Sequence, residues 1–237
     1  MSREHDNHAL VVDLNDISFS WKPELDPTLE ISSLQVQSQE HLFIKGPSGC
    51  GKSTLLSLLT GINQAQKGHV SILGQDLTQL SPSQRDTFRA ENIGYIFQQF
   101  NLLPYLSVVD NVILPCQFSK KRRLKVDQDL NDTARELLRR LHLPEALMDK
   151  PVTELSIGQQ QRVAAARALI GKPKLIIADE PTSALDHDNR ELFIELLMEQ
   201  ADQAESTLIF VSHDPTLEKL FTQSIDLKVV NNAKGFQ

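Results

Sequence analysis

Gly46-Pro47-Ser48-Gly49-Cys50-Gly51-Lys52-Ser53 is the stretch that decides the fold of this 237-residue chain. It matches G-x-x-x-x-G-K-[ST], which forms a phosphate-binding loop when a strand precedes it and a helix follows it. The apolar run 42–44 predicts the strand, and residues 53–60 have a helical composition, with Gly61 suited to the end of the helix. The sequence therefore predicts a strand, a phosphate-binding loop and a helix in that order.

The chemistry of this loop follows from its residue types. Glycines let the backbone turn so that successive N–H groups face phosphate oxygens, and the N-terminus of the following helix adds partial positive charge. Lys52 is predicted to hold the β- and γ-phosphates of a nucleotide, and Ser53 to offer its hydroxyl to Mg²⁺. The predicted nucleotide-binding residues of the loop are Gly46, Pro47, Ser48, Gly49, Cys50, Gly51, Lys52, Ser53 and Thr54.

Strand and helix patterns alternate on both sides of the loop. Apolar and polar residues alternate at 9–21, 29–36 and 69–73, and short apolar runs lie at 93–97, 175–178 and 208–211, so strands are predicted there. Helices are predicted after Ser81-Pro82, at 158–170 and at 189–203, whereas residues 100–148 show no strand pattern and indicate a helical insertion. Apolar strands alternating with helices are typical of an α/β protein with a parallel sheet covered on both faces.

Two carboxylates, Asp179 and Glu180, follow the apolar run 175–178. They stand where a parallel sheet presents ligand-binding residues, at the carboxyl ends of its strands. Asp179 is predicted to hold Mg²⁺ directly or through a water molecule, and Glu180 to act as the general base for an attacking water. Taken alone, the two acids could instead cap the helix that follows, but the phosphate-binding loop favours the catalytic interpretation.

The segment Leu155-Ser156-Ile157-Gly158-Gln159 resembles the L-S-G-G-Q signature of the ABC ATPases. The order and spacing of the motifs are similar to that family over nearly the whole chain. In the family, the signature of one subunit closes over ATP held on the phosphate-binding loop of the other. The resemblance therefore implies an ATP hydrolase that forms a homodimer around Mg²⁺ and ATP, with Ser156, Gly158 and Gln159 binding the nucleotide. Ile157 departs from the family pattern, in which glycine is usual, so a positive φ at that position would be unfavourable.

Three further residues, Gln98, Asp186 and His213, match the family one by one. The resemblance implies that Gln98 lies near Mg²⁺ and the lytic water, that Asp186 lies at the nucleotide and the dimer interface, and that His213 contacts the γ-phosphate. Trp21 resembles the aromatic residue that stacks on adenine. Burial in the core is the alternative for Trp21 and for Phe19, which lies two residues earlier on the same strand face. The implied catalytic set is Glu180, His213, Lys52 and Gln98, and the implied metal set is Ser53, Gln98 and Asp179.

The resemblance also implies the fold and its division. We expect an α/β P-loop NTPase core with a mainly parallel sheet, an N-terminal antiparallel β subdomain and a helical subdomain. Residues 1–237 would form one ABC ATPase domain, with the core and β subdomain in 1–100 and 160–237. The helical subdomain would span 101–159 and end in the signature.

Composition and charge limit where the chain acts. A formal net charge of -7 argues against a general nucleic-acid binder. The polar N-terminus lacks the pattern of a signal peptide, and no apolar run is long enough to span a bilayer. Cys50 and Cys116 match no metal spacing and are expected to be reduced thiols. The resemblance then places the chain peripherally on the cytoplasmic face of the inner membrane, bound to an integral membrane permease.

Residues 101–115, beginning Asn101-Leu102-Leu103-Pro104, are similar to the ATPases of lipoprotein-release and macrolide-export systems. The alternative is the ATPase of a mechanotransmission complex that regulates cell-envelope enzymes without transport. A soluble ABC ATPase of DNA repair or translation fits less well, because the chain has room for neither a coiled-coil insertion nor a second cassette. The basic run Lys120-Lys121-Arg122-Arg123, followed by Lys125, is expected to be a solvated loop, with anionic lipid or acidic permease loops as alternative partners.

Overall fold

The computed structural model describes residues 9–22, 24–183 and 187–233, and these residues contain two β-sheets. The first is antiparallel with strand order β2-β1-β4-β5, and the second is parallel with order β6-β7-β8-β3-β9. The strands are β1 (Leu10–Phe19), β2 (Leu29–Gln37), β3 (His41–Lys45), β4 (Lys67–Ile72), β5 (Gln75–Asp76), β6 (Ile93–Ile96), β7 (Leu175–Asp179), β8 (Thr207–Ser212) and β9 (Gln223–Asp226). The expected combination of a parallel core sheet with an antiparallel β sheet is confirmed.

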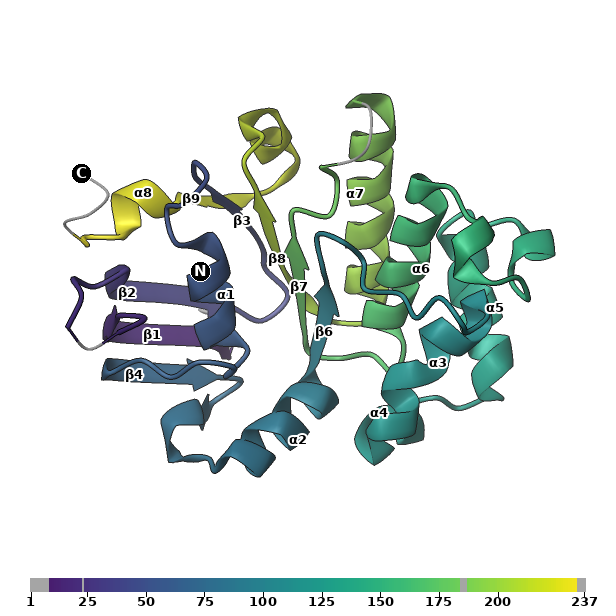
Figure 1. The fold of residues 1–237 in the computed structure, drawn as a ribbon. Helices are drawn as coiled ribbons and strands as arrows, with labels where there is room; N and C mark the ends of the chain where they lie inside the picture. Colours follow the sequence, from purple (N-terminus) through teal and green to yellow (C-terminus); the bar gives the residue numbers. More distant parts are fainter. Residues whose placement is uncertain (1–8, 23, 184–186, 234–237) are drawn as a thin grey trace, which may run out of the picture.

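Helices cover the parallel sheet, and α3, α4 and α5 form a helical region on the side away from the antiparallel sheet (Figure 1). They are α1 (Lys52–Leu59), α2 (Pro82–Asn92), α3 (Val108–Phe118), α4 (Lys120–Leu124), α5 (Leu130–Arg140), α6 (Ile157–Leu169), α7 (His187–Gln203) and α8 (Leu227–Val230). Short 3₁₀ helices are η1 (Leu77–Gln79), η2 (Glu145–Leu147), η3 (Val152–Glu154) and η4 (Pro215–Leu220). As predicted, the described residues between β6 and β7 form no strand, and α2 begins at an Ser81 cap with Pro82 in its first turn.

The parallel sheet separates two hydrophobic cores. Side chains of successive strand residues point to opposite faces, so Phe43 and Phe210 pack with α3, α6 and α7, whereas Ile44 and Ile209 pack with α1 and the antiparallel sheet. Every residue of β8 is buried, as expected of a central strand covered on both faces. α1 lies between the two sheets, and its buried leucines join them into one body (Figure 1). The phosphate-binding loop is thereby fixed by the hydrophobic core beneath it.

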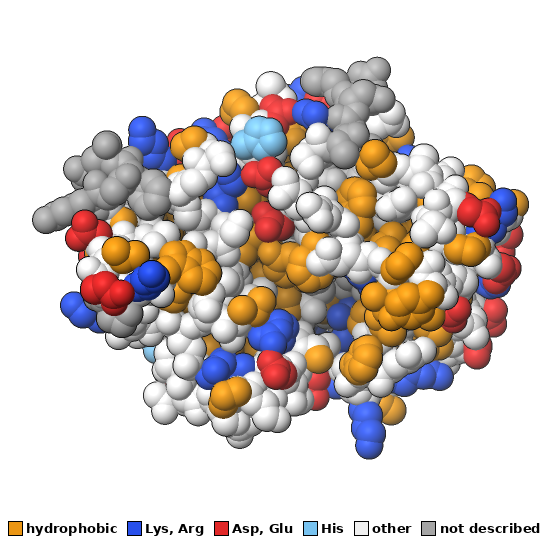
Figure 2. Space-filling model, in the orientation of Figure 1, with side chains coloured by type: hydrophobic (Ala, Val, Ile, Leu, Met, Phe, Trp, Pro, Cys, Tyr) orange, Lys and Arg blue, Asp and Glu red, His pale blue; other side chains and the backbone are white. Residues whose placement is uncertain are grey.

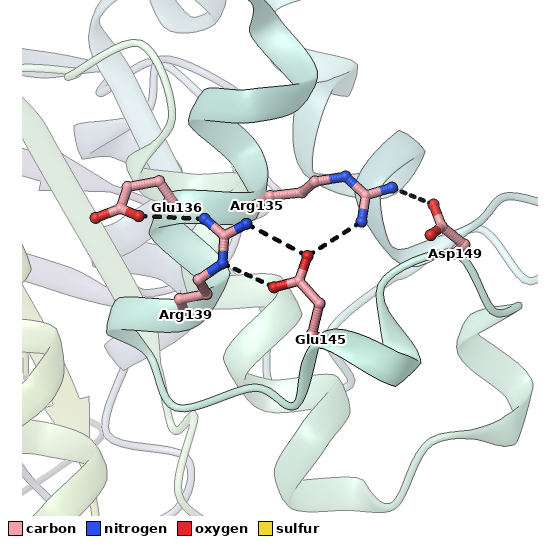
Figure 3. A network of polar contacts seen from close by, with 5 residues as sticks. All are labelled: Arg135, Glu136, Arg139, Glu145 and Asp149. Atoms are coloured by element: carbon pink, nitrogen blue, oxygen red, sulfur yellow. Dashed lines mark hydrogen bonds and ion pairs between the residues drawn. The ribbon is translucent and has the colours of Figure 1, made fainter.

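The end of α5 is tied to the segment that leads to the signature by a network of ion pairs (Figure 3). Glu145 accepts hydrogen bonds from Arg139, with Nε to Oε2 at 2.7 Å, and its other oxygen lies 3.6 Å from Nη1 of Arg135. Arg135 also pairs with Asp149, and Arg139 with Glu136. The hydrogen bonds from Arg139 are the main reason that the pKa of Glu145 is lowered. Because these pairs are exposed, each orients the segment more than it stabilises the fold.

The basic run 120–125 was expected to be a solvated loop. Lys120, Lys121 and Arg123 are exposed as expected, but the run is helical and Arg122 is buried, so the expectation is wrong in these two respects. Residues 120–124 form α4, and Arg122 is only 2% exposed. Its guanidinium donates to the carbonyls of Ile170 and Ala168 at the end of α6, at 2.5 and 2.6 Å. Burial lowers the pKa of Arg122 to about 10, so it is charged at neutral pH. Arg122 is part of a basic run that predicts surface charge, but in the structure it holds α4 against the core.

Replacing Arg122 by methionine is expected to lower the free energy of unfolding by about 2–4 kcal/mol, because it leaves buried carbonyls without donors. Chemical denaturation measures this value. The matched control is Arg123→Met, since Arg123 is the exposed neighbour, and this substitution should change stability by less than about 0.5 kcal/mol. Equal stability of the two variants would contradict the structural role of Arg122.

Candidate functional site

The predicted phosphate-binding loop joins the end of β3 to the start of α1. Gly51 is the N-cap residue of α1 and has a φ of +100°. No side chain accepts a capping hydrogen bond there, so the N–H groups of the first helical turn are left for a ligand. A Cβ on Gly51 would lie 2.8 Å from a Leu29 methyl, and one on Gly46 would lie 2.6 Å from the Cys50 sulfur. The positive φ of Gly51 therefore favours glycine there, whereas a Cβ on Gly46 would require the Cys50 side chain to shift. Ser53 is exposed in the first turn of α1, whereas Thr54 is buried.

The side chain of Lys52 is folded back over this loop. Its Nζ donates to the carbonyls of Gly46 at 2.7 Å and Pro47 at 3.1 Å, and lies 3.4 Å from Oε1 of Glu180. Only 7% of the side chain is exposed, so the ammonium is held by oxygen partners away from bulk water. A phosphate entering the loop would meet a charged donor that is already in place.

Asp179 and Glu180 stand at the carboxyl end of β7, as predicted. Asp179 accepts a hydrogen bond from the hydroxyl of Tyr95, at 3.3 Å. Burial raises the pKa of Asp179, and the Tyr95 hydrogen bond partly opposes this increase. Burial likewise raises the pKa of Tyr95. Glu180 has a positive φ of 45°, and its N–H donates to the Val211 carbonyl on β8 at 2.9 Å, which turns the chain away from the sheet.

His213 follows β8 and reaches the same place. Its Nδ1 lies 3.0 Å from Oε2 of Glu180, so Glu180 contacts Lys52 with one oxygen and His213 with the other. More than half of the His213 side chain is exposed, and Figure 2 shows histidine and carboxylate side chains gathered over the ends of β7 and β8. Asp214 caps η4 by accepting from the Thr216 N–H at 3.0 Å, so the helix start expected at Asp214-Pro215 is present as a 3₁₀ helix.

The side chains of Gln98 and Trp21 are both exposed. Gln98 lies in the turn after β6, and its side chain makes no hydrogen bond to any residue that the structure describes. Trp21 is 59% exposed just beyond the end of β1 and meets Phe19 edge to face, with ring centroids 5.2 Å apart. Of the two aromatic residues, Phe19 is therefore the core residue, at 5% exposure, and the burial alternative is wrong for Trp21.

The signature residues begin α6 on the helical side of the molecule. The Ser156 hydroxyl accepts from the Gln159 N–H at 3.3 Å, and the Gln159 side chain accepts from the Ser156 N–H at 2.9 Å. This reciprocal pair is a capping box, which the spacing of Ser156 and Gln159 could have revealed in the sequence. Ile157 lies in the first turn of α6 without a positive φ, so the strain considered for this position is absent. Ser156 and Ile157 are exposed, and no hydrogen bond or ion pair within the described chain joins the signature to Lys52 or Glu180.

Asp186 lies outside the described residues. Within them, the structure brings Lys52, Asp179, Glu180 and His213 to one edge of the sheet and leaves the signature apart from it. Sequence reasoning missed Tyr95, whose contact with Asp179 depends on the pairing of β6 with β7.

Cys50 lies within the phosphate-binding loop. Burial raises the pKa of its thiol, which agrees with an unreactive cysteine.

The chain is similar to known proteins in both sequence and structure. The family model described as ABC transporter matches residues 29–183. A dimeric structure of a post-hydrolysis state of the ATP-binding cassette MJ0796, bound to ADP and Pi, superimposes with a TM-score of 0.80. It shares 34% sequence identity, and the match covers 91% of this chain and 93% of that chain.

Two named relatives are similar over most of the chain. The lipoprotein-releasing system ATP-binding protein LolD of Shewanella sp. (strain MR-7) is 40% identical over 195 residues, which cover 82% of each protein. The macrolide export ATP-binding/permease protein MacB of Syntrophobacter fumaroxidans is 39% identical over 209 residues; these cover 87% of this chain but only 29% of MacB. The chain therefore belongs to the ABC transporter family, as an ATP-binding domain that hydrolyses ATP.

Proposed function

We propose that two copies of this chain close around two ATP molecules and Mg²⁺, and that this closure drives an integral membrane permease. The observation that carries the proposal is the separation of the two halves of the site. Lys52, Glu180 and His213 converge beside the phosphate-binding loop, whereas Ser156 is exposed at the start of α6 with no contact to them. A second copy, turned head to tail, would bring its signature to the nucleotide on the first.

Each residue of the site is assigned a role in this proposal. Residues Gly46 to Thr54 cradle the phosphates, Lys52 neutralises the β- and γ-phosphates, and Glu180 accepts the proton of the attacking water. His213 contacts the γ-phosphate and orients Glu180, and Trp21 stacks on adenine. From the other copy come Ser156, Gly158 and Gln159, with Asp186 at the interface between the copies.

The oxygen groups near the loop fit Mg²⁺. The Ser53 hydroxyl, the Asp179 carboxylate and the Gln98 amide oxygen are hard ligands of the type that Mg²⁺ takes beside substrate phosphates. Bound there, the ion would neutralise charge on the β- and γ-phosphate oxygens. Tyr95 supports this assignment, because its hydrogen bond holds the Asp179 carboxylate in one orientation and favours its ionised form.

The proposed partner is a permease, with the chain peripheral on the cytoplasmic face of the inner membrane. No described helix is long and apolar enough to cross a bilayer. In this proposal the permease carries the transport path. The named relatives favour the lipoprotein-release or macrolide-export type. We also propose that 1–237 act as one ABC ATPase domain, with 101–159 as its helical subdomain, and that it does not act on nucleic acid.

Purification of a tagged Glu180→Gln chain from detergent-solubilised membranes with Mg²⁺ and ATP tests the partner. Mass spectrometry is expected to identify a co-purifying permease with few spans and a large extracytoplasmic domain, because a closed dimer dissociates slowly. Recovery of no membrane protein would contradict the transport proposal, and recovery of a permease with many spans would contradict the proposed type.

Trp21→Ala is expected to raise the KM for ATP about tenfold with little change in kcat, since stacking contributes about 1–2 kcal/mol to nucleotide binding. Leu25→Ala is the matched control, because Leu25 is similarly exposed nearby. Steady-state ATPase assays of both variants measure KM and kcat. An unchanged KM in Trp21→Ala would exclude adenine stacking on this ring.

A further inference from the structure

A basic and apolar surface surrounds α4, at a distance from the nucleotide site. Phe118 is 77% exposed and Leu124 is 82% exposed, so two large apolar side chains close in the sequence are accessible to solvent here. Lys120 and Arg123 lie beside them, and their side chains pair with no other described residue. Figure 2 shows lysine and arginine side chains next to hydrophobic ones along this lower edge, over α4. We call Phe118, Lys120, Arg123 and Leu124 the α4 surface.

The orientation of the α4 surface is fixed by Arg122. This side chain points into the core and is bonded to the end of α6, so it sets the rotation of the short helix. At about 100° per residue, Lys120 and Leu124 are then on the outward side of α4, with Arg123 on its flank. Ser119 is also buried and caps the helix by accepting from the Arg122 N–H at 3.1 Å. The apolar side chain of Leu124 is therefore exposed by the way the helix is anchored.

The surroundings of α4 are positive although the chain carries a net charge of -7. Burial is the main reason that the pKa of Lys125 is lowered, and the nearby charges of Lys121, Lys174, Arg122 and Lys172 lower it further. Elsewhere in residues 101–159, cations are paired with acids, partly in the network of Figure 3; these cations are Arg135, Arg139, Arg140 and Lys150. Among the described residues of α4, Lys121 alone has an acidic partner, Glu91 at 3.7 Å. Cations grouped around exposed aromatic and aliphatic side chains are typical of surfaces that enter the headgroup region of anionic membranes.

We propose that the α4 surface docks on an anionic lipid bilayer, with Phe118 and Leu124 entering the headgroup region while Lys120 and Arg123 contact lipid phosphates. Charge complementarity favours this occupant over a neutral partner, and the apolar side chains distinguish it from a purely ionic contact. The interaction goes beyond the proposed function, because it needs neither the nucleotide nor the permease. It would hold the ATPase at the membrane and orient it there.

Flotation of the full chain with vesicles tests this surface. Vesicles with about one-third phosphatidylglycerol in phosphatidylcholine are expected to carry the protein, and pure phosphatidylcholine vesicles are not. Lys120→Gln/Arg123→Gln should weaken binding about 30-fold, and Phe118→Ser/Leu124→Ser about tenfold or more. Val229→Ser is the control, because Val229 is equally exposed on α8. ATPase activity should remain unchanged in every variant.

Absence of flotation, equal binding to both kinds of vesicle, or equal binding by the variants would overturn the proposal. Capture of an acidic protein or of nucleic acid by the α4 surface, without binding to anionic vesicles, would also overturn it.

A second inference concerns Arg167, which lies ten residues into α6 and is 8% exposed. Its guanidinium donates to the carbonyls of Asn101, at 2.7 Å, and Phe100. Both acceptors have a positive φ, of 49° and 59°, although neither is glycine. Two successive left-handed residues are unfavourable without a partner that holds them.

The geometry points to Arg167 as a positioning residue that makes the turn after Gln98 and the signature helix move as one body. The Gln98 turn leads directly into Phe100 and Asn101, and the helix that carries Arg167 begins at the Ser156 cap. A shift of the turn would therefore be passed to the signature through two hydrogen bonds to one side chain. This inference rests on the proposed roles of Gln98 and Ser156.

Arg167→Met is expected to lower kcat about tenfold while the KM for ATP stays within about twofold, because the phosphate-binding loop is not altered. Arg167→Met/Asn101→Gly should recover part of kcat, since glycine adopts a positive φ without help. Arg85→Met is the control, because Arg85 also donates to a loop carbonyl, that of Leu80, at 2.7 Å. An unchanged kcat in folded Arg167→Met, or a loss that Asn101→Gly does not relieve, would overturn the inference. An inactive unmodified chain would instead contradict the proposed function.

Discussion

Replacing Glu180 by glutamine is expected to slow ATP turnover by about 10²-fold or more while ATP still binds. Glutamine retains the shape of the side chain but cannot accept the proton of the attacking water. The contacts that bind phosphate, from the loop and from Lys52, are unchanged. Single-turnover hydrolysis of radiolabelled ATP, together with a nucleotide-binding titration, separates the two effects.

The control for this variant is Glu205→Gln, because Glu205 is an exposed acid that pairs with Lys174 before the start of β8, at the opposite end of that strand from His213. That substitution should leave turnover unchanged. A Glu180→Gln protein that hydrolyses ATP at the normal rate would show that another group accepts the proton, and His213 would then be the first to examine, since it lies within 3.0 Å.

Lys52→Ala is expected to weaken ATP binding by about 10²-fold or more, because the ammonium makes charge-assisted hydrogen bonds worth about 1.5–3 kcal/mol each. The loss should also leave the Glu180 carboxylate without its 3.4 Å partner. Titration with a fluorescent ATP analogue measures the change in Kd.

Lys45→Ala is a matched control for Lys52→Ala. Lys45 ends β3, the strand that leads into the phosphate-binding loop, but its Nζ pairs with Glu218 at 2.7 Å, outside the loop. Its removal should leave the Kd within about twofold of the original value. Equal losses in the two variants would mean that general charge, and not the position of Lys52, determines binding.

The sequence predicts most of the fold because its signals are local. The phosphate-binding loop, its strand and its helix are all contained in residues 42–61, and the apolar runs identify β7 and β8 within about two residues of their observed ends. The Ser81-Pro82 cap of α2 is also a local signal, read correctly from two adjacent residues. Patterns of this kind depend on residues that are close in the sequence and not on which strands become neighbours in the fold.

Features that depend on tertiary neighbours could not be predicted in this way. Arg122 and Arg167 are indistinguishable from surface arginines until the end of α6 and the Gln98 turn are brought against them. Tyr95 becomes a partner of Asp179 only because β6 pairs with β7. The positive φ of Glu180 is likewise set by its bond to β8 and not by its residue type. In each case a buried polar group finds its partner far away in the sequence.

The central claim is that ATP lies between two copies of the chain, and the mass of Glu180→Gln in solution tests it most directly. Light scattering after size-exclusion chromatography should give the 26.6 kDa monomer without nucleotide and about twice that mass with Mg²⁺ and ATP. Adding Ser156→Arg to the same chain should abolish the dimer, because a bulky cation would replace the exposed cap of α6. A Glu180→Gln chain that binds ATP yet keeps the mass of one copy would contradict the account.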